Sequence, residues 1–161
     1  MKMFYILLIA LFLVNIATGQ FNDAKLNQIE LMKQFPGSWK CEVNDTTIFW
    51  ESKSYGTGIE CNFKYITRGK VVQEGKQLWG YDKTIDKFIA VTLRKGMDIQ
   101  IDADWFISQN KLESLYYKDI PDSEKASVKW ELEFTSPDMF TETCIANGKS
   151  IKTVIFTRVT K

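Results

Sequence analysis

The chain contains no histidine, and this absence limits its chemistry more than any motif does. Ser-His-Asp and Cys-His catalysis use an imidazole as general base, and histidine-ligated zinc and haem need it as a ligand. Composition therefore excludes these activities. An enzyme built on this chain would have to use carboxylates, tyrosine, lysine or a thiol, for example Glu142 with Arg158. No pattern brings those two side chains together, and we expect no enzymatic activity.

Acidic residues recur on one face of a predicted strand over residues 98–105. Asp98, Asp102 and Asp104 are spaced so that they could hold calcium or form an acid/base pair. The opposite face carries Ile99, Ile101, Ala103 and Trp105. Such alternation is typical of a half-buried strand, and no calcium loop is recognisable. We therefore expect the three aspartates to face solvent.

Cysteine chemistry is open in two ways. Cys41, Cys61 and Cys144 allow one disulfide and one free thiol, with three possible pairings. Alternatively, all three are buried and act as small apolar side chains. Cys41 and Cys61 lie on the apolar phase of their strands, which slightly favours burial.

The elements that must position these residues are short runs of alternating apolar and polar residues, which fill the chain from Trp39 to Arg158. This pattern predicts an antiparallel meander with one buried face. Closing the sheet removes its edges. We therefore expect an all-β fold, a single antiparallel up-and-down β-barrel of about eight to ten strands.

One amphipathic segment precedes the strands. Residues 22–34 are the single good helix candidate, with Asn22 as the predicted N-cap. Leu26, Ile29 and Met32 recur at helical spacing and form a narrow apolar stripe. We expect this short N-terminal helix to cover one end of the barrel.

The first nineteen residues have the pattern of a secretory signal peptide. Lys2 precedes a continuous apolar run over residues 3–14, and small residues follow up to a predicted cleavage site near Gly19. The run is too short to span a hydrocarbon core of about 30 Å, so no integral membrane span is expected in the mature chain. We therefore predict a secreted or periplasmic protein, with a signal peptide over 1–19 and one barrel domain over 20–161.

The charge balance excludes some partners. The chain has 21 Lys and Arg residues against 20 Asp and Glu residues. No basic stripe favours nucleic acid, and no polybasic cluster favours an anionic membrane. We expect a monomer that binds neither.

Aromatic residues are frequent on the apolar phase of the strands, at 14% of the chain. They either fill a core or form the wall of a ligand cavity, and the alternation is compatible with both. The predicted ligand-binding residues are Trp50, Phe63, Tyr65, Trp79, Trp105, Trp130, Phe134 and Arg158.

The start and end of the strand region together resemble the calycin, or lipocalin-like, superfamily. Gly37-Ser38-Trp39 begins the first strand after a short helix, and Arg158 lies near the end of the last strand. The resemblance implies that Gly37 and Trp39 are structural. It also implies that Trp39 packs at the closed end of a barrel with Arg158 lying across it.

Two nearer resemblances differ in what they imply. The tail over residues 156–161 is similar to that of fatty-acid-binding proteins, in which an arginine and a tyrosine hold the ligand carboxylate, but Thr160 stands at the tyrosine position. A bacterial lipocalin-like family of unknown function is similar at Gly80-Tyr81-Asp82, at Lys87-Phe88 and in the last hairpin. It covers most of the mature chain, and each motif is short.

These observations predict a barrel that binds a small apolar or amphipathic molecule without a cofactor or metal. Arg158 would pair with an anionic head group of that ligand. A second hypothesis is a solid barrel that acts through its outer surface as an interaction or inhibitor module. The third hypothesis, an enzyme without histidine, is the least favoured.

Overall fold

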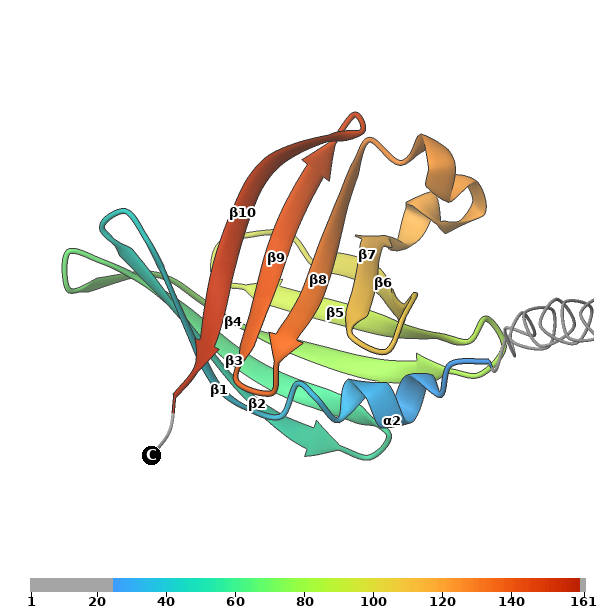
Figure 1. Cartoon of the computed structure of the whole chain (residues 1–161). Coiled ribbons are helices and arrows are strands. Elements are labelled where there is room, and N and C mark those ends of the chain that lie inside the picture. Colours follow the sequence, from blue (N-terminus) through green and yellow to red (C-terminus); the bar gives the residue numbers. More distant parts are fainter. Residues whose placement is uncertain (1–24, 160–161) are drawn as a thin grey trace, which may run out of the picture.

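Ten antiparallel strands follow one another in chain order, and each pairs with its neighbours in sequence (Figure 1). The computed structural model describes residues 25–159. The last strand closes on the first through Trp39 opposite Arg158 and Lys40 opposite Thr157. The predicted all-β, up-and-down barrel is therefore confirmed, and its topology is compatible with a calycin-like fold.

The strands are joined mostly by tight turns. The strands are β1 (Gly37–Val43), β2 (Thr46–Tyr55), β3 (Gly58–Thr67), β4 (Lys70–Asp82), β5 (Lys87–Arg94), β6 (Gln100–Phe106), β7 (Lys111–Tyr116), β8 (Val128–Ser136), β9 (Met139–Ala146) and β10 (Lys149–Arg158). A longer connection between β7 and β8 contains the 3-10 segment η1 (Tyr117–Lys125).

A short helix, α2 (Gln28–Met32), lies across one end of the barrel (Figure 1). The predicted cap at Asn22 lies outside the described residues. In the described part, the helix begins later than predicted because the Asn27 side chain accepts a hydrogen bond from the Glu30 N–H, at 3.2 Å. The Gln28 amide makes hydrogen bonds with both the N–H and the carbonyl of Phe106. These two bonds fasten the helix to the end of β6.

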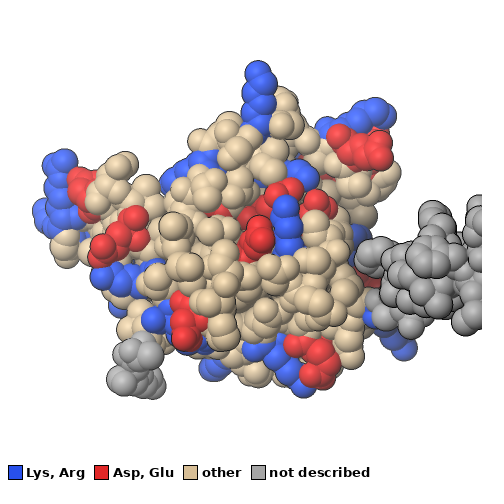
Figure 2. Space-filling model, viewed as in Figure 1, with Lys and Arg blue, Asp and Glu red and all other residues tan. Residues whose placement is uncertain are grey.

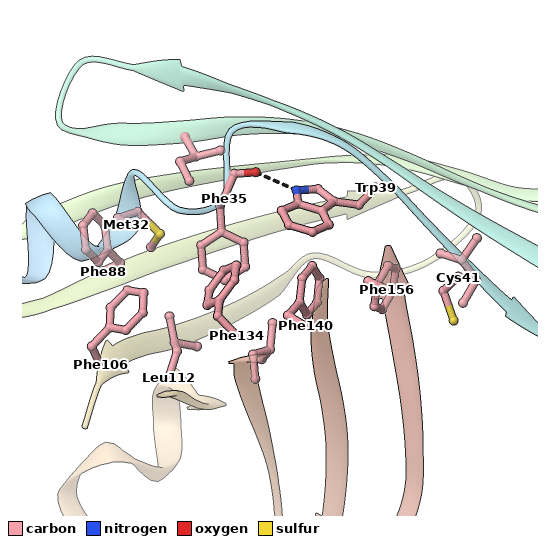
Figure 3. Packing of buried hydrophobic residues seen from close by; sticks show 13 residues of the cluster. Met32, Phe35, Trp39, Cys41, Phe88, Phe106, Leu112, Phe134, Phe140 and Phe156 are labelled. Atoms are coloured by element: carbon pink, nitrogen blue, oxygen red, sulfur yellow. Dashed lines mark hydrogen bonds between the residues drawn. The ribbon is translucent and has the colours of Figure 1, made fainter. Parts of the chain in front are cut away.

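The helix covers a core of aromatic rings, which we call the closed-end core. It is drawn in Figure 3, and its members include Met32, Phe35, Trp39, Phe88, Phe106, Leu112, Phe134, Phe140 and Phe156. The Trp39 indole donates to the Phe35 carbonyl at 2.8 Å, so its one polar atom is satisfied although the residue is fully buried. Phe140 stacks on Phe156 with 4.7 Å between ring centroids. This end of the barrel is therefore packed with side chains.

Arg158 seals the same end from the side of β10. Its guanidinium lies 4.1 Å from the centroid of the Trp39 ring and donates to the carbonyls of Gln34, Pro36 and Pro137. Gly37 gives it room, because a Cβ at that position would lie 2.1 Å from the arginine Nη1. The packing implied by the calycin resemblance for Trp39 and Arg158 is confirmed. The N–H donors of the Arg158 guanidinium are therefore taken up by backbone carbonyls at the closed end.

The outer surface carries both signs of charge. Figure 2 shows Lys and Arg interspersed with Asp and Glu over the visible face, without a large area of one sign. On β7 and β8, Lys111 pairs with Glu131 at 2.7 Å, and Lys129 pairs with Glu113 at 3.2 Å. The alternation predicted for β8 is correct, since these charged residues point out while Leu132 is buried.

The orientation predicted for β6 is wrong. Asp102 and Asp104 are only 3% and 4% exposed, whereas Ile101 is 44% exposed. The pairing with β5 explains this result, because Asp104 lies opposite the fully buried Phe88 and directly opposite residues share a face. The aspartates therefore face the barrel interior, and the isoleucines face out.

Candidate functional site

A cavity of about 210 Å³ lies inside the barrel above the closed-end core. We call it the barrel cavity. Phe35, Leu112 and Leu132 form its apolar floor and belong to that core. Its aromatic wall consists of Trp50, Tyr65, Trp79 and Trp130. Its polar wall consists of Gln77, Arg94, Gln100, Asp102, Asp104, Ser114 and Glu142.

Strand register aligns the polar wall in rows. Gln77 on β4 lies opposite Thr92 on β5, which lies opposite Gln100 on β6. Across the barrel, Glu142 on β9 lies opposite Leu132 on β8, one of the floor residues. Because residues directly opposite each other share a face, these polar side chains must point inward once their apolar neighbours do.

Asp104 is a buried carboxylate of the polar wall. It accepts a hydrogen bond from the Trp79 indole at 2.6 Å. Its pKa is raised to about 7, mainly by burial and also by the neighbouring Asp102 carboxylate, while hydrogen bonds from Ser114 and Trp79 act in the opposite direction. Asp104 can therefore gain or lose a proton near neutral pH.

Asp102 is held by neutral donors. It accepts two hydrogen bonds from the Gln100 amide, at 2.9 and 2.8 Å, and the oxygen of that amide accepts one from Arg94. Burial raises the pKa of the Asp102 carboxyl, and both Gln100 and the charge of Arg94 counteract that shift. Gln100 thus stands between the guanidinium and this carboxylate, which do not form a direct ion pair.

Glu142 differs from both aspartates because nothing in the described part of the chain donates a hydrogen bond to it or pairs with it. Burial raises its pKa to about 7, opposed only by the charges of Lys152 and Arg94 at longer range. The residue is half-buried and lines the cavity. A carboxylate without such a partner can accept hydrogen bonds from a ligand.

The lining has a surplus of acidic groups. Among the described residues, three carboxyls and one guanidinium line the cavity. The arrangement can accept hydrogen bonds from a polar group at one side while the indole rings and the floor contact an apolar part. Within residues 25–159, no group of three or more Cys, Asp or Glu side chains is placed to hold a metal ion.

The predicted ligand-binding residues divide into two groups. The structure brings Trp50, Tyr65, Trp79 and Trp130 together around the cavity. Phe134 and Arg158 lie elsewhere because both belong to the closed end, where the phenyl ring packs against Phe35 and the guanidinium binds backbone carbonyls.

Phe63 and Trp105 are not among the residues that line the cavity. Phe63 packs against the backbone of Gly75, where any Cβ would collide with its ring. Trp105 faces outward on β6, and the Lys87 ammonium lies 3.0 Å from the centroid of its ring. Its outward position follows from the inverted phase of β6.

Sequence reasoning missed the polar wall. Glu142 lies two residues from Phe140 on β9 and therefore shares its inward phase. The alternation of β9 around an inward Phe140 was the signal that could have placed Glu142 inside. Asp102 and Asp104 were assigned to the outer face, and only the pairing of β6 with Phe88 and Ala90 on β5 reverses that assignment.

All three cysteines are free thiols in the structure. Cys41 and Cys61 are each 1% exposed, and burial raises the pKa of Cys61 to about 11. The alternative in which the cysteines act as small apolar side chains therefore describes these two.

No protein-family model and no curated protein matches the chain. In the described part of the chain, no helix has the length and apolar character needed to cross a membrane.

Proposed function

We propose that this protein binds a small amphipathic molecule in the barrel cavity and does not transform it. The observation that carries the proposal is the cavity of about 210 Å³ itself, with an apolar floor on one side and a polar wall on the other. Pockets for drug-sized ligands are typically about 300–1,000 Å³, so the ligand is smaller than those. A purely apolar ligand would leave the wall carboxyls unsolvated, which is costly.

Two sequence observations complete the proposal. The predicted signal peptide supports a secreted or periplasmic protein, although residues 1–19 lie outside the described residues. The Trp39–Arg158 packing supports a lipocalin-like ancestry for the barrel. The predicted pairing of Arg158 with an anionic head group is not part of the proposal, because backbone carbonyls already occupy that guanidinium.

The test is titration of intrinsic tryptophan fluorescence with small amphipathic amines, alcohols and carboxylates. Trp50, Trp79 and Trp130 line the cavity, so an occupant should change their emission. A Leu132→Trp variant should fill the floor and abolish the response to the same compound. Trp105→Phe serves as the matched control, since it removes an indole that lies outside the cavity.

No response to any compound class, or an equal affinity in the Leu132→Trp variant, would refute binding in the cavity. A search for turnover of the compounds that bind tests the second half of the proposal. Conversion of any of them by wild type and not by Glu142→Gln would show an enzyme.

One observation favours the second candidate, an interaction module. Leu78, Val91 and Ile101 lie opposite one another across β4, β5 and β6 and are 42%, 36% and 44% exposed on the outer face. Contiguous exposed apolar side chains often mark protein contacts. Sedimentation of wild type and of a Val91→Lys variant tests this candidate. Self-association in wild type only would support it.

A further inference from the structure

We propose that the occupant of the barrel cavity is a small organic cation, with its ammonium group against Glu142 and its apolar part among the indole rings. The proposal rests on ligand binding in the cavity as proposed above and adds the charge of the ligand.

The cavity wall is acidic. It contains the carboxyls of Asp102, Asp104 and Glu142. In the structure described over residues 25–159, none of the three forms an ion pair, because the donors to the aspartates are the neutral Gln100 amide and Trp79 indole. Buried carboxylates without a paired cation are costly. A positively charged ligand would remove that cost.

Glu142 is the carboxylate of the wall that is available to accept a hydrogen bond from a ligand. Trp79 already donates to Asp104, and Gln100 donates twice to Asp102. Glu142 receives no hydrogen bond from the described residues, and its pKa responds only to burial and to distant charges. An ammonium N–H would give this carboxylate a charge-assisted hydrogen bond, which is stronger than one from a neutral donor.

The aromatic wall suits an organic cation better than a metal ion. Trp50, Trp79, Trp130 and Tyr65 surround the cavity, and aromatic faces attract organic cations while also contacting their apolar atoms. A bare metal ion would need several oxygen or thiolate ligands together, and no group of three or more acidic or thiol side chains of the described chain is arranged in that way. A substituted ammonium ion fits this wall better.

An anion is disfavoured by the same geometry. Arg94 is the one cationic side chain that lines the cavity in the described part of the chain, and its guanidinium donates to Gln100. A carboxylate ligand bound to this guanidinium would also lie among Asp102, Asp104 and Glu142. Like charges at such short range repel strongly in a low-dielectric interior.

Binding should become tighter with rising pH. A cation binds the deprotonated forms of Asp104 and Glu142, whose pKa values are about 7. The other groups facing Glu142 are Arg94, Lys152, Tyr65, Cys41 and Cys144. Burial raises the pKa of Tyr65 and of both thiols, so these three stay neutral between pH 6 and 8. The pH response therefore comes from Glu142, Asp104 and the neighbouring Asp102, whose pKa burial also raises.

The experiment uses three probes of nearly the same shape: 2-phenylethylamine, 2-phenylethanol and 3-phenylpropionate. Isothermal titration calorimetry of the mature protein at pH 6 and pH 8 measures the affinity for each. We expect the amine to bind most tightly, with an affinity that rises several-fold from pH 6 to pH 8. Proton release on binding should appear as a dependence of the heat on the ionisation enthalpy of the buffer.

A pair of variants locates the charge. Glu142→Gln should weaken binding of the amine at pH 8 by about ten- to hundredfold, as expected for loss of a charge-assisted hydrogen bond. It should change the affinity for 2-phenylethanol by less than about threefold. Glu133→Gln is the matched control, since Glu133 is exposed on β8, and its affinity for the amine should equal that of wild type.

The outcomes separate the two proposals. Equal or tighter binding of 2-phenylethanol or 3-phenylpropionate overturns the cationic ligand and leaves ligand binding in place. Tight amine binding that is unchanged in Glu142→Gln also overturns it. If no probe binds while the wider fluorescence screen finds a ligand, only the charge assignment fails, and if that screen also finds none, the proposed function fails.

Discussion

At the closed end of the barrel, β8, β9 and β10 point Phe134, Phe140 and Phe156 inward, where Phe140 stacks on Phe156 and lies tilted against Phe134. Two residues farther along β9, the inward side chain is Glu142, which lines a cavity. On β6, Phe106 belongs to the packed end, while Asp104 and Asp102 follow it inside. The same strands thus provide an apolar, packed half and a polar, hollow half.

This difference separates stability from function along the length of each strand. The packed half buries large rings that each contribute several kcal/mol. The hollow half contains buried carboxyls that oppose folding when they are ionised. Side chains that lower the stability of an empty barrel are unlike core residues, and they are the ones expected to contact a ligand.

The largest expected effect is in the packed half. Phe140→Ala should lower the free energy of unfolding by about 3 to 5 kcal/mol, because the ring is fully buried between Trp39 and Phe156. Urea denaturation followed by far-ultraviolet circular dichroism measures the change. Leu93→Ala, at a position 51% exposed, is the control and should cost less than about 1 kcal/mol. Similar losses in the two variants would contradict the assignment of this half as the stabilising core.

The seal at the closed end should give the next largest effect. Arg158→Gln removes donors to three backbone carbonyls and the contact with the Trp39 ring. We expect the free energy of unfolding to fall by about 2 kcal/mol, with the affinity for any cavity ligand unchanged. Thermal denaturation and a fluorescence titration of the same variant check the two halves of this prediction. A selective loss of affinity would place Arg158 in the binding site after all.

The hollow half should respond in the opposite direction. Glu142→Gln should raise the free energy of unfolding at pH 8 by about 2 kcal/mol, since it replaces a buried carboxylate with a neutral group of the same shape. The pKa of Glu142 is about 7 in the folded protein against an ordinary glutamate value of 4.5, so the folded state binds this proton more tightly. The stability of wild type should therefore fall as the pH rises from about 4 to 7.

Urea denaturation of wild type and of Glu142→Gln across that pH range measures this dependence. The slope should be smaller in the variant, and Asp104→Asn should reduce it in the same way, since the pKa of Asp104 also rises to about 7. If the free energy of unfolding of wild type instead increases with pH over this interval, ionisation of Glu142 and Asp104 does not destabilise the fold. That result would contradict the proposed difference between the packed half and the hollow half.

The smallest effect is expected on the outer wall. Trp105→Phe weakens the contact with the Lys87 ammonium and should cost about 0.5 to 1 kcal/mol. The variant should keep the ligand-induced fluorescence change of wild type. Loss of that change would return Trp105 to the inside of the barrel and contradict the phase of β6.

The packed half was predictable because its residues obey simple alternation. On β8, Leu132 and Phe134 are apolar and in phase, and charged residues fill the other phase, so both faces follow from one strand alone. The Trp39–Arg158 contact followed from resemblance to a known superfamily. Both expectations concern residues whose environment matches their chemistry.

The hollow half was not predictable from single strands. On β6, isoleucines and aspartates alternate equally well, and the strand alone favours the wrong face. The correct phase is determined by pairing with Phe88 and Ala90 on β5, which is a property of register. Glu142 lies inward because Phe140 on the same strand does. Polar residues kept inside for binding break the alternation rule, which makes them hard to find.

The closure between β1 and β10 has a consequence for how the interior exchanges with solvent. In the described chain their ladder consists of two residue pairs near Trp39, whereas β1 and β2 pair over the full length of β1. Beyond Lys40 the amides of β1 have no ladder partner on the β10 side. The β1 amides beyond Lys40 should therefore exchange with deuterium faster than amides elsewhere in the barrel wall. Local opening of the barrel should begin between β1 and β10, next to the hollow half.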